Sequence, residues 1–257
     1  MADSRVVVIK NLSKRFDTLS VLENISLEVT RGENLIVFGR SGQGKSVLLK
    51  CIIGLMTLDS GEIFINGQNI GKLKINELNQ VRKNIGFLFQ SSALYDSMTV
   101  YENLSFPLKR HFPDMTLNEI NDKVKYTLEL VSLEEAINKM PAELSGGMKK
   151  RIGLARSIIT DPELMLYDEP TTGLDPITTK EISELILSLQ KKLNMTSIVV
   201  THDLICAEII ADRAIFLKDA KIAYEGDIKQ LTESNDSFLK NFFSHEILDI
   251  PNESQKV

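Results

Sequence analysis

The chain has 257 residues, of which 43% are apolar and 25% charged, and a formal net charge of -5. This length suits one large α/β domain or two small ones, with enough apolar residues for a sizeable core. The acidic balance argues against a nucleic-acid partner, because a phosphate-binding surface usually carries a basic excess. The cysteines, Cys51 and Cys206, have neither metal-binding spacing nor a disulfide framework, so we expect two small buried hydrophobes.

The chain shows no segment that would carry it into a membrane. Residues 1–10 lack the apolar core of a signal peptide. No run reaches the roughly 18 apolar residues that a spanning helix needs. We therefore expect a cytoplasmic protein that serves a membrane only by binding another subunit.

Predicted strands dominate the first part of the chain. Apolar or alternating runs predict strands at Val6–Ile9, Leu22–Val29, Asn34–Phe38, Glu62–Ile65 and Asn84–Phe89. A helix is predicted over residues 47–55, and the Asn-Gly pair at 66–67 indicates a hairpin turn. We expect an antiparallel layer in this part of the chain.

The second part alternates helices with strands. From residue 91 to about 159 the pattern is helical, with Pro107, Pro113 and Pro141 as expected breaks. Further strands are predicted at Leu164–Tyr167, Ser197–Val200, Ala214–Leu217 and Lys221–Tyr224, and helices at Pro176–Leu193 and Asp203–Ala211. This order predicts an α/β fold, in which helices flank a mainly parallel sheet that carries the helical insertion 91–159.

The last residues are expected to form a tail. We predict one domain over residues 1–232 and a tail over 233–257. The tail is polar apart from Phe238, Leu239, Phe242 and Phe243, which are spaced to form one helical face. We expect the tail from Phe238 to Val257, this face included, to pack on a second copy of the chain or on a small partner.

A glycine-rich segment follows the buried strand Asn34–Phe38 and opens a helix, as the pattern G-x-x-x-x-G-K-[ST] requires. Glycines let backbone N–H groups close around a phosphate, and the helix N-terminus attracts its charge. Lys45 is expected to reach the β- and γ-phosphates, and the Ser46 hydroxyl to ligate Mg²⁺. The predicted nucleotide-binding residues are Gly39, Arg40, Ser41, Gly42, Gln43, Gly44, Lys45, Ser46 and Val47.

Two acids follow the apolar strand Leu164–Tyr167. We expect Asp168 to hold Mg²⁺ through Ser46 and water, because the strand should end beside the phosphate loop. Neighbouring strand residues point to opposite sides, so Glu169 is expected to act instead as the general base on the attacking water. A polar turn is the alternative for this pair. The sequence has no N-K-x-D motif for guanine, which favours ATP over GTP.

Six elements in order resemble the ATP-binding-cassette (ABC) ATPases over essentially the whole chain. They are the Lys45 loop, Gln90, Leu144-Ser145-Gly146-Gly147, Asp168-Glu169, Leu174-Asp175 and His202. The resemblance implies a P-loop NTPase fold of ABC type and hydrolysis of Mg²⁺-ATP. It also implies that Gln90 reaches Mg²⁺ and the water and hinges the helical insertion, while His202 contacts the γ-phosphate and orients Glu169.

The resemblance further implies a homodimer. Ser145, Gly146 and Gly147 open a helix whose N-terminus suits a γ-phosphate, and in the family they cap the ATP of a second copy. Asp175 would then communicate across the dimer. Phe16 would stack on adenine, with a place in the core as the alternative. The basic run 149–151 is expected to be only a solvated flank of the helix.

Residues 86–108 most resemble the Mce-associated, Mla-type lipid-transport ATPases, as do Ser46-Val47-Leu48 and residues 175–178. This implies phospholipid transport through a separate integral-membrane permease, with the chain on the cytoplasmic face of the inner membrane. An Mce-domain lipid-binding protein and a STAS-domain protein are implied as further partners. Amino-acid importers, lipoprotein-release complexes and non-transport ABC ATPases are the alternatives.

Apolar residues also cluster beside the expected hinge at Gln90. They are Leu94, Tyr95, Met98 and Phe106. Packing inside the helical insertion is one explanation for them. Our hypothesis is that some of them line the groove that receives a helix of the permease.

Overall fold

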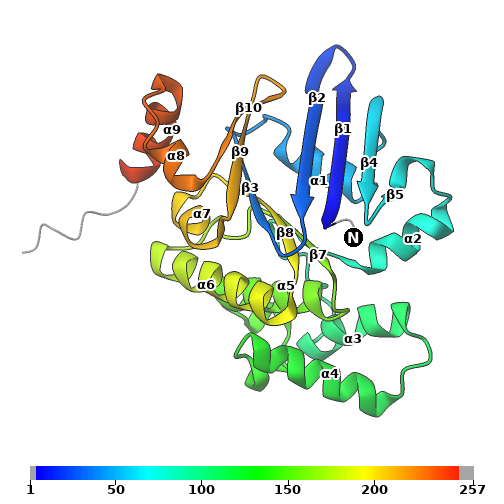
Figure 1. Cartoon of the computed structure of the whole chain (residues 1–257). Coiled ribbons are helices and arrows are strands. Elements are labelled where there is room, and N and C mark those ends of the chain that lie inside the picture. The colour runs from blue at the N-terminus through cyan, green and yellow to red at the C-terminus, as the bar shows by residue number, and fades with distance from the viewer. Residues whose placement is uncertain (1–3, 249–257) are drawn as a thin grey trace, which may run out of the picture.

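Two β-sheets of different kinds organise the chain in the computed structural model, which describes residues 4–248 and the side chains up to residue 244 (Figure 1). The smaller sheet is antiparallel and has the strand order β2-β1-β4-β5. Its strands are β1 (Arg5–Phe16), β2 (Leu19–Thr30), β4 (Ser60–Ile65) and β5 (Gln68–Asn69). This sheet is the antiparallel layer that the sequence predicts.

The larger sheet is parallel except at one edge. Its order is β10-β9-β3-β8-β7-β6, and only β10 runs antiparallel to its neighbour. The strands are β3 (Asn34–Phe38), β6 (Ile85–Leu88), β7 (Leu164–Asp168), β8 (Thr196–Val200), β9 (Arg213–Lys218) and β10 (Lys221–Gly226). The predicted fold class, a mainly parallel sheet with flanking helices, is confirmed.

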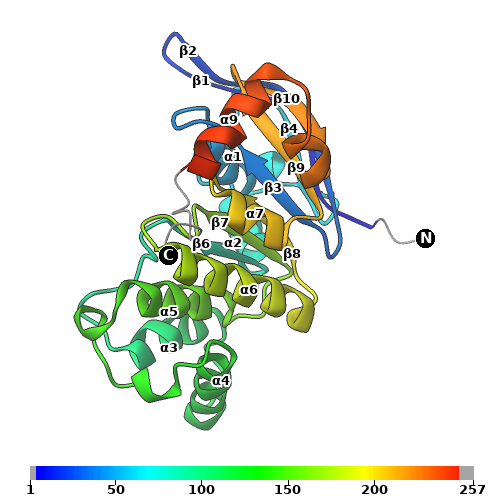
Figure 2. The same ribbon diagram turned by 90° about the vertical axis from the view of Figure 1, so that its left-hand side faces the viewer.

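The helices fill the space around the sheets. Helix α1 (Lys45–Ile52) packs its apolar face into a core shared by both sheets. A second core lies on the opposite face of the larger sheet, between the sheet and a layer of helices that includes α5, α6 and α7. Figure 2 shows α3 and α4 beyond α5 and α6, at the end of the molecule away from the antiparallel sheet. The remaining bounds are α2 (Ile75–Lys83), α3 (Val100–His111), α4 (Leu117–Leu130), α5 (Gly146–Ile158), α6 (Pro176–Leu193), α7 (Leu204–Ile210), α8 (Ile228–Thr232) and α9 (Ser237–Leu248).

The strand order brings three loops to one edge of the larger sheet. In the parallel register, Val200 of β8 pairs with Val37 of β3 and with Asp168 of β7. The segments that follow these three strands therefore leave the sheet side by side, which is where ligands bind in open α/β sheets. They begin at Gly39, Glu169 and Thr201.

Two local predictions are wrong. Pro107 lies inside α3 and does not end it. The helix starts with a capping box between Thr99 and Glu102 and buries Leu104 and Leu108, and these contacts offset the one backbone hydrogen bond that a proline removes. Helix α2 was not predicted, although Ile75, Leu78 and Val81 recur every three residues; of the helix, only Val81 is buried.

The apolar face of the tail packs on the chain itself. Phe242 and Phe243 of α9 meet the ring of Phe38 at centroid distances of 6.0 and 5.5 Å, and Phe242 meets Phe216 at 4.6 Å. All four rings are buried. The expected docking of this face on a second copy or a small partner is therefore wrong, and residues 249–257 of the predicted tail lie outside the described part.

No helix among residues 4–248 is both long and apolar enough to cross a membrane.

The contact of β6 with α5 and β7 gives a stability prediction. A Cβ atom on Gly86 would lie 2.2 Å from the Met165 sulfur and 2.4 Å from the Ser157 carbonyl oxygen. We expect Gly86→Ala to lower the free energy of unfolding by about 1–3 kcal/mol, because the backbone at Ser157 must shift to admit the methyl group. Urea denaturation measures this change. Gly71→Ala is the control, since its Cβ would meet only Asn69 Oδ1 at 3.4 Å. Equal stability of the two variants would contradict this packing.

Candidate functional site

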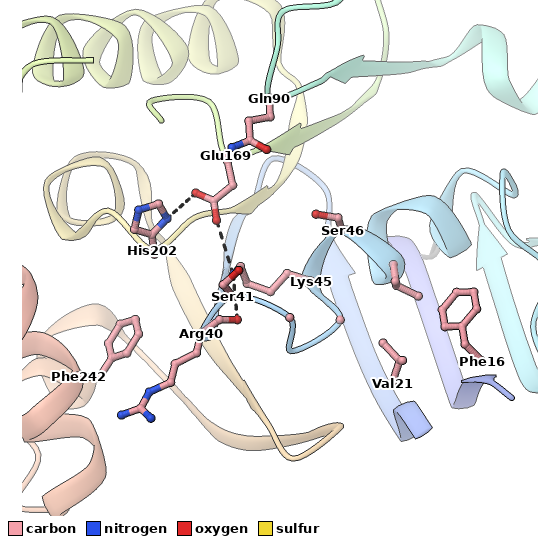
Figure 3. A pocket seen from close by; sticks show the side chains of 13 residues that line it. Phe16, Val21, Arg40, Ser41, Lys45, Ser46, Gln90, Glu169, His202 and Phe242 are labelled. Carbon is pink, nitrogen blue, oxygen red and sulfur yellow. Dashed lines mark hydrogen bonds and ion pairs between the residues drawn. The ribbon is translucent and has the colours of Figure 1, made fainter. Parts of the chain in front are cut away.

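A cavity of about 670 Å³ opens where β3, β7 and β8 end (Figure 3). Predicted site residues from distant parts of the sequence face one another across it. In Figure 3, Gln90, Glu169 and His202 lie on one side of the loop that carries Lys45, and Phe16 lies beyond the loop's far end. The lining residues are Phe16, Val21, Arg40, Ser41, Gly42, Gly44, Lys45, Ser46, Val47, Gln90, Glu169, His202 and Phe242.

The loop conformation depends on its glycines. Gly44 has φ +88° at the start of α1, and a Cβ there would lie 2.7 Å from the Val21 carbonyl oxygen of β2. Gly42 has φ +81°, and a Cβ would meet no atom within 4 Å. The loop therefore packs tightly on one side and is open on the other. Gln43 does not line the cavity, because its side chain accepts a hydrogen bond from the Asp219 N–H at 2.8 Å.

Lys45 is buried at the base of the cavity. Its ammonium donates to the Gly39 carbonyl at 2.7 Å and lies 3.6 Å from Glu169 Oε1. The neighbouring Ser46 hydroxyl donates to Asp168 Oδ1 at 2.8 Å. Thus the cation and the hydroxyl of one loop each face one of the two acids that end β7.

Glu169 and His202 form a hydrogen-bonded pair. Glu169 Oε2 lies 2.8 Å from His202 Nδ1 and accepts from the Thr172 hydroxyl at 3.3 Å. Burial alone would raise the pKa of the Glu169 carboxyl, but the His202 hydrogen bond and the charges of His202 and Lys45 outweigh it. The pKa of Glu169 is therefore held below its usual value, and the group is a carboxylate at neutral pH.

Lys150 lies near this site, although no motif in the sequence indicated it. Its ammonium donates to the Gln90 carbonyl at 2.6 Å and to the Glu169 carbonyl at 3.4 Å. The side chain is buried, so the expectation that the basic run 149–151 is only a solvated flank is wrong for this residue. Burial lowers the pKa of the Lys150 ammonium, and the charge of Glu169 opposes that shift.

Phe16 is not a core residue. It ends β1 at the edge of the cavity with 43% of its surface exposed. The Lys14 ammonium lies 5.5 Å from its ring centroid. The ring is therefore available to a flat ligand group that enters the cavity beyond the glycine-rich loop.

Four predicted residues lie elsewhere. Ser145, Gly146 and Gly147 begin α5 and are not among the residues that line the cavity. The Ser145 hydroxyl accepts from the Met148 N–H at 3.3 Å, and a Cβ on Gly146 would meet no atom within 4 Å. Asp175 caps α6, where its carboxylate accepts from the N–H groups of Ile177 and Thr178 at 3.0 Å each. The structure thus separates this group from the glycine-rich loop.

The residues present suit Mg²⁺ bound together with a phosphate group. Ser46 and Asp168 supply two oxygens in direct contact, and oxygen is the ligand that Mg²⁺ prefers. Within residues 4–248, no group of three or more His, Cys, Asp and Glu side chains forms a metal site. Mg²⁺ bound beside a nucleotide usually takes its other ligands from water and substrate phosphates.

Comparison with known proteins agrees with this geometry. Residues 22–172 match the ABC transporter family model. The intermembrane phospholipid transport system ATP-binding protein MlaF of Haemophilus influenzae is 41% identical over 95% of this chain and 92% of its own length. The methionine import ATP-binding protein MetN of Clostridium tetani is 37% identical over 98% of this chain and 78% of its own.

A solved structure is also similar. The ATP-binding cassette MJ0796, in a dimeric post-hydrolysis state bound to ADP and Pi, aligns with a TM-score of 0.80 at 32% identity. The alignment covers 86% of this chain and 98% of that one. The chain belongs to the ABC transporter family, in the class of its ATP-binding subunits. It is an ATPase that acts on Mg²⁺-ATP.

The exposed ring of Phe16 gives a binding prediction. We expect Phe16→Ala to weaken ATP binding by about 5–100-fold, since stacking of a base on an aromatic ring contributes about 1–3 kcal/mol. The melting temperature should not change, because the ring packs in no core. Leu19→Ala is the control, because Leu19 is an exposed apolar residue of the same hairpin that does not line the cavity. Titration of a fluorescent ATP analogue measures the affinity; unchanged affinity of Phe16→Ala would exclude stacking.

Proposed function

We propose that this ATPase powers phospholipid transport through a separate integral-membrane permease. The observation that carries the lipid assignment is the similarity to MlaF, which extends over nearly the whole of both chains. The resemblance of residues 86–108 to Mla-type ATPases agrees with it. The chain would then work at the cytoplasmic face of the inner membrane, as part of a complex.

We further propose how the cavity holds its substrate. The Lys45 ammonium and the N–H groups of residues 39–47 would bind the β- and γ-phosphates, and Phe16 would stack on adenine. Ser46, Asp168 and Gln90 would hold Mg²⁺, which supplies charge neutralisation on the phosphates. The buried Lys45 and the direct Ser46–Asp168 contact of 2.8 Å support these roles.

Glu169 is our candidate for the general base. Its carboxylate borders the cavity, is ionised, and has one oxygen bound to His202. His202 would orient this carboxylate and contact the γ-phosphate, while Gln90 would position the attacking water. Because the water attacks phosphorus in line, most of the rate enhancement would come from positioning and charge neutralisation.

A second copy would complete the site. The cavity is open, and Ser145, Gly146 and Gly147 do not line it. The open face of Gly146 at the start of α5 leaves room for a phosphate from another molecule. In a head-to-tail homodimer each Ser-Gly-Gly turn would cap the partner's ATP, with Asp175 near the dimer interface. The dimeric state of MJ0796 supports this arrangement.

The proposed permease contact lies beside Gln90. Tyr95 and Phe106 are exposed, and their ring centroids lie 5.4 Å apart. Leu94, in contrast, packs on the core. Next to them is a cleft of about 160 Å³, whose cationic lining residues are Arg82, Lys83 and Arg156. The Arg156 Nε is buried without a hydrogen-bond partner among the described residues. An apolar helix that carries a carboxylate would suit the exposed rings and the cationic side chains of this cleft.

Amino-acid import is the second candidate function. The similarity to the methionine import protein MetN at 37% identity favours it, and the catalytic residues would be the same in both cases. The cargo does not decide the chemistry at the nucleotide, so only the partner proteins and bound molecules separate the two functions. Mce-domain and STAS-domain partners belong to the lipid proposal alone.

Two substitutions separate binding from hydrolysis. We expect Glu169→Gln to slow ATP hydrolysis by about 10²–10⁴-fold with ATP affinity retained, because the amide cannot accept the water's proton. Lys45→Ala should instead weaken ATP binding, since it removes the buried cation of the loop. Phosphate release and equilibrium binding are the measurements. Near-normal turnover of Glu169→Gln, or unchanged affinity of Lys45→Ala, would refute the respective role.

Co-purification tests the cargo. A tagged copy of the chain, extracted from native membranes in mild detergent, should bring with it a permease, an Mce-domain protein and bound phospholipid, identified by mass spectrometry. The Glu169→Gln variant is a matched sample, because its slow hydrolysis should preserve the ATP-bound complex. Recovery of a permease with a periplasmic amino-acid-binding protein and no enrichment of phospholipid would contradict the lipid assignment and favour import.

A further inference from the structure

Lys150 is a buried cation whose hydrogen bonds join three parts of the site. It lies on α5, five residues after the capping Ser145, and only 6% of it is exposed. Its ammonium donates to the carbonyl of Gln90 at 2.6 Å and to that of Glu169 at 3.4 Å. A buried ammonium is costly unless it is well paired, so this arrangement needs both carbonyls.

Two further residues on the same face of α5, Gly153 and Arg156, contact the loop that follows Gln90. Arg156 donates to the Ala93 carbonyl at 2.9 Å. Gly153, halfway between the two cations, lets the helix approach Ser92, since a Cβ there would lie 2.8 Å from the Ser92 Cβ. Lys150, Gly153 and Arg156 are spaced three residues apart and so lie on neighbouring turns of one face.

The loop that these residues hold is conformationally strained. Ser92 has φ +63° and Ala93 has φ +45°, in the left-handed region that side chains disfavour. Such conformations persist only where surrounding contacts fix them. The hydrogen bonds from Lys150 and Arg156 are contacts of this kind, one at each end of residues 90–93.

The backbone of Glu169 also has a strained conformation that surrounding contacts must fix. Its φ is +52°, again left-handed. Its N–H donates to the Val200 carbonyl at 2.9 Å, and its own carbonyl accepts from Lys150 and, at 3.4 Å, from the Thr172 N–H. The backbone turn that aims the carboxylate at His202 and Lys45 is therefore held from β8 on one side and from α5 on the other.

We propose that Lys150 is a positioning residue for ATP hydrolysis, which ties the backbones of Gln90 and Glu169 to the helix that begins with Ser145-Gly146-Gly147. Through it, a shift of α5 reaches both residues that act on the attacking water. The inference rests on the proposed roles of Gln90 and Glu169. It predicts that Lys150 affects turnover and leaves nucleotide binding alone, because it lies outside the cavity lining.

The test is Lys150→Met, which keeps much of the side-chain volume and removes the donors. In the complex with the permease we expect kcat to fall by about 10–100-fold, as a small misplacement of catalytic groups does, with KM for Mg²⁺-ATP within about twofold of the wild type. Lys149→Met is the matched control. Lys149 is the adjacent lysine on α5 and is only half-buried, and its side chain makes no hydrogen bond or ion pair with the described residues.

A double variant separates positioning from general damage. Because Lys150 acts partly through Glu169, adding Lys150→Met to Glu169→Gln should lower single-turnover hydrolysis by less than the same substitution lowers it in the wild type, so the two effects are not fully additive. Turnover of Lys150→Met within about twofold of the wild type, or full additivity, would overturn the inference alone. So would a matching loss of ATP affinity and melting temperature. Normal turnover of Glu169→Gln would overturn the proposed function and this inference together.

Discussion

The contact between the Lys45 ammonium and the Glu169 carboxylate joins the two halves of the site. It spans 3.6 Å between the loop after β3 and the end of β7, and both side chains are largely buried. In such surroundings the charge of Lys45 helps to hold the pKa of Glu169 below its usual value, whereas a lone buried charge would be costly. A nucleotide phosphate that reaches Lys45 brings competing negative charge. Binding of substrate therefore acts directly on the carboxylate proposed to activate the water.

Helix α5 takes part in the proposed site at two places. Its N-terminus, capped by Ser145, lies outside the cavity of its own chain, where it suits the nucleotide of a second copy. One turn later Lys150 turns inward and holds the backbone of Gln90 and Glu169. The end of the helix reaches the cationic cleft through Arg156. A single rigid helix thus contacts the catalytic loop and the proposed permease site, and its N-terminus would contact the partner's nucleotide.

Residue spacing predicted the parts of the site that follow buried strands. The glycine-rich loop, Asp168, Glu169 and His202 come together because parallel strands end at one edge. The loop and the two acids were expected from their places after apolar runs, whereas His202 was expected only from the resemblance to ABC ATPases. Lys150 was missed, because a lysine in a basic run usually faces solvent and its carbonyl partners lie 60 and 19 residues away. The packing of α9 was missed for a similar reason. An apolar face in the sequence does not show which surface covers it, and Phe38 and Phe216 are far from α9 in the sequence.

The most direct test of the account is the mass of the Glu169→Gln variant with and without Mg²⁺-ATP, measured by light scattering in the presence of the permease complex and alone. We expect an ATP-dependent dimer, which Ser145→Arg in the same background should abolish because it blocks the turn that caps the partner's phosphate. A variant that binds ATP yet stays monomeric under both conditions would contradict the proposed two-copy site.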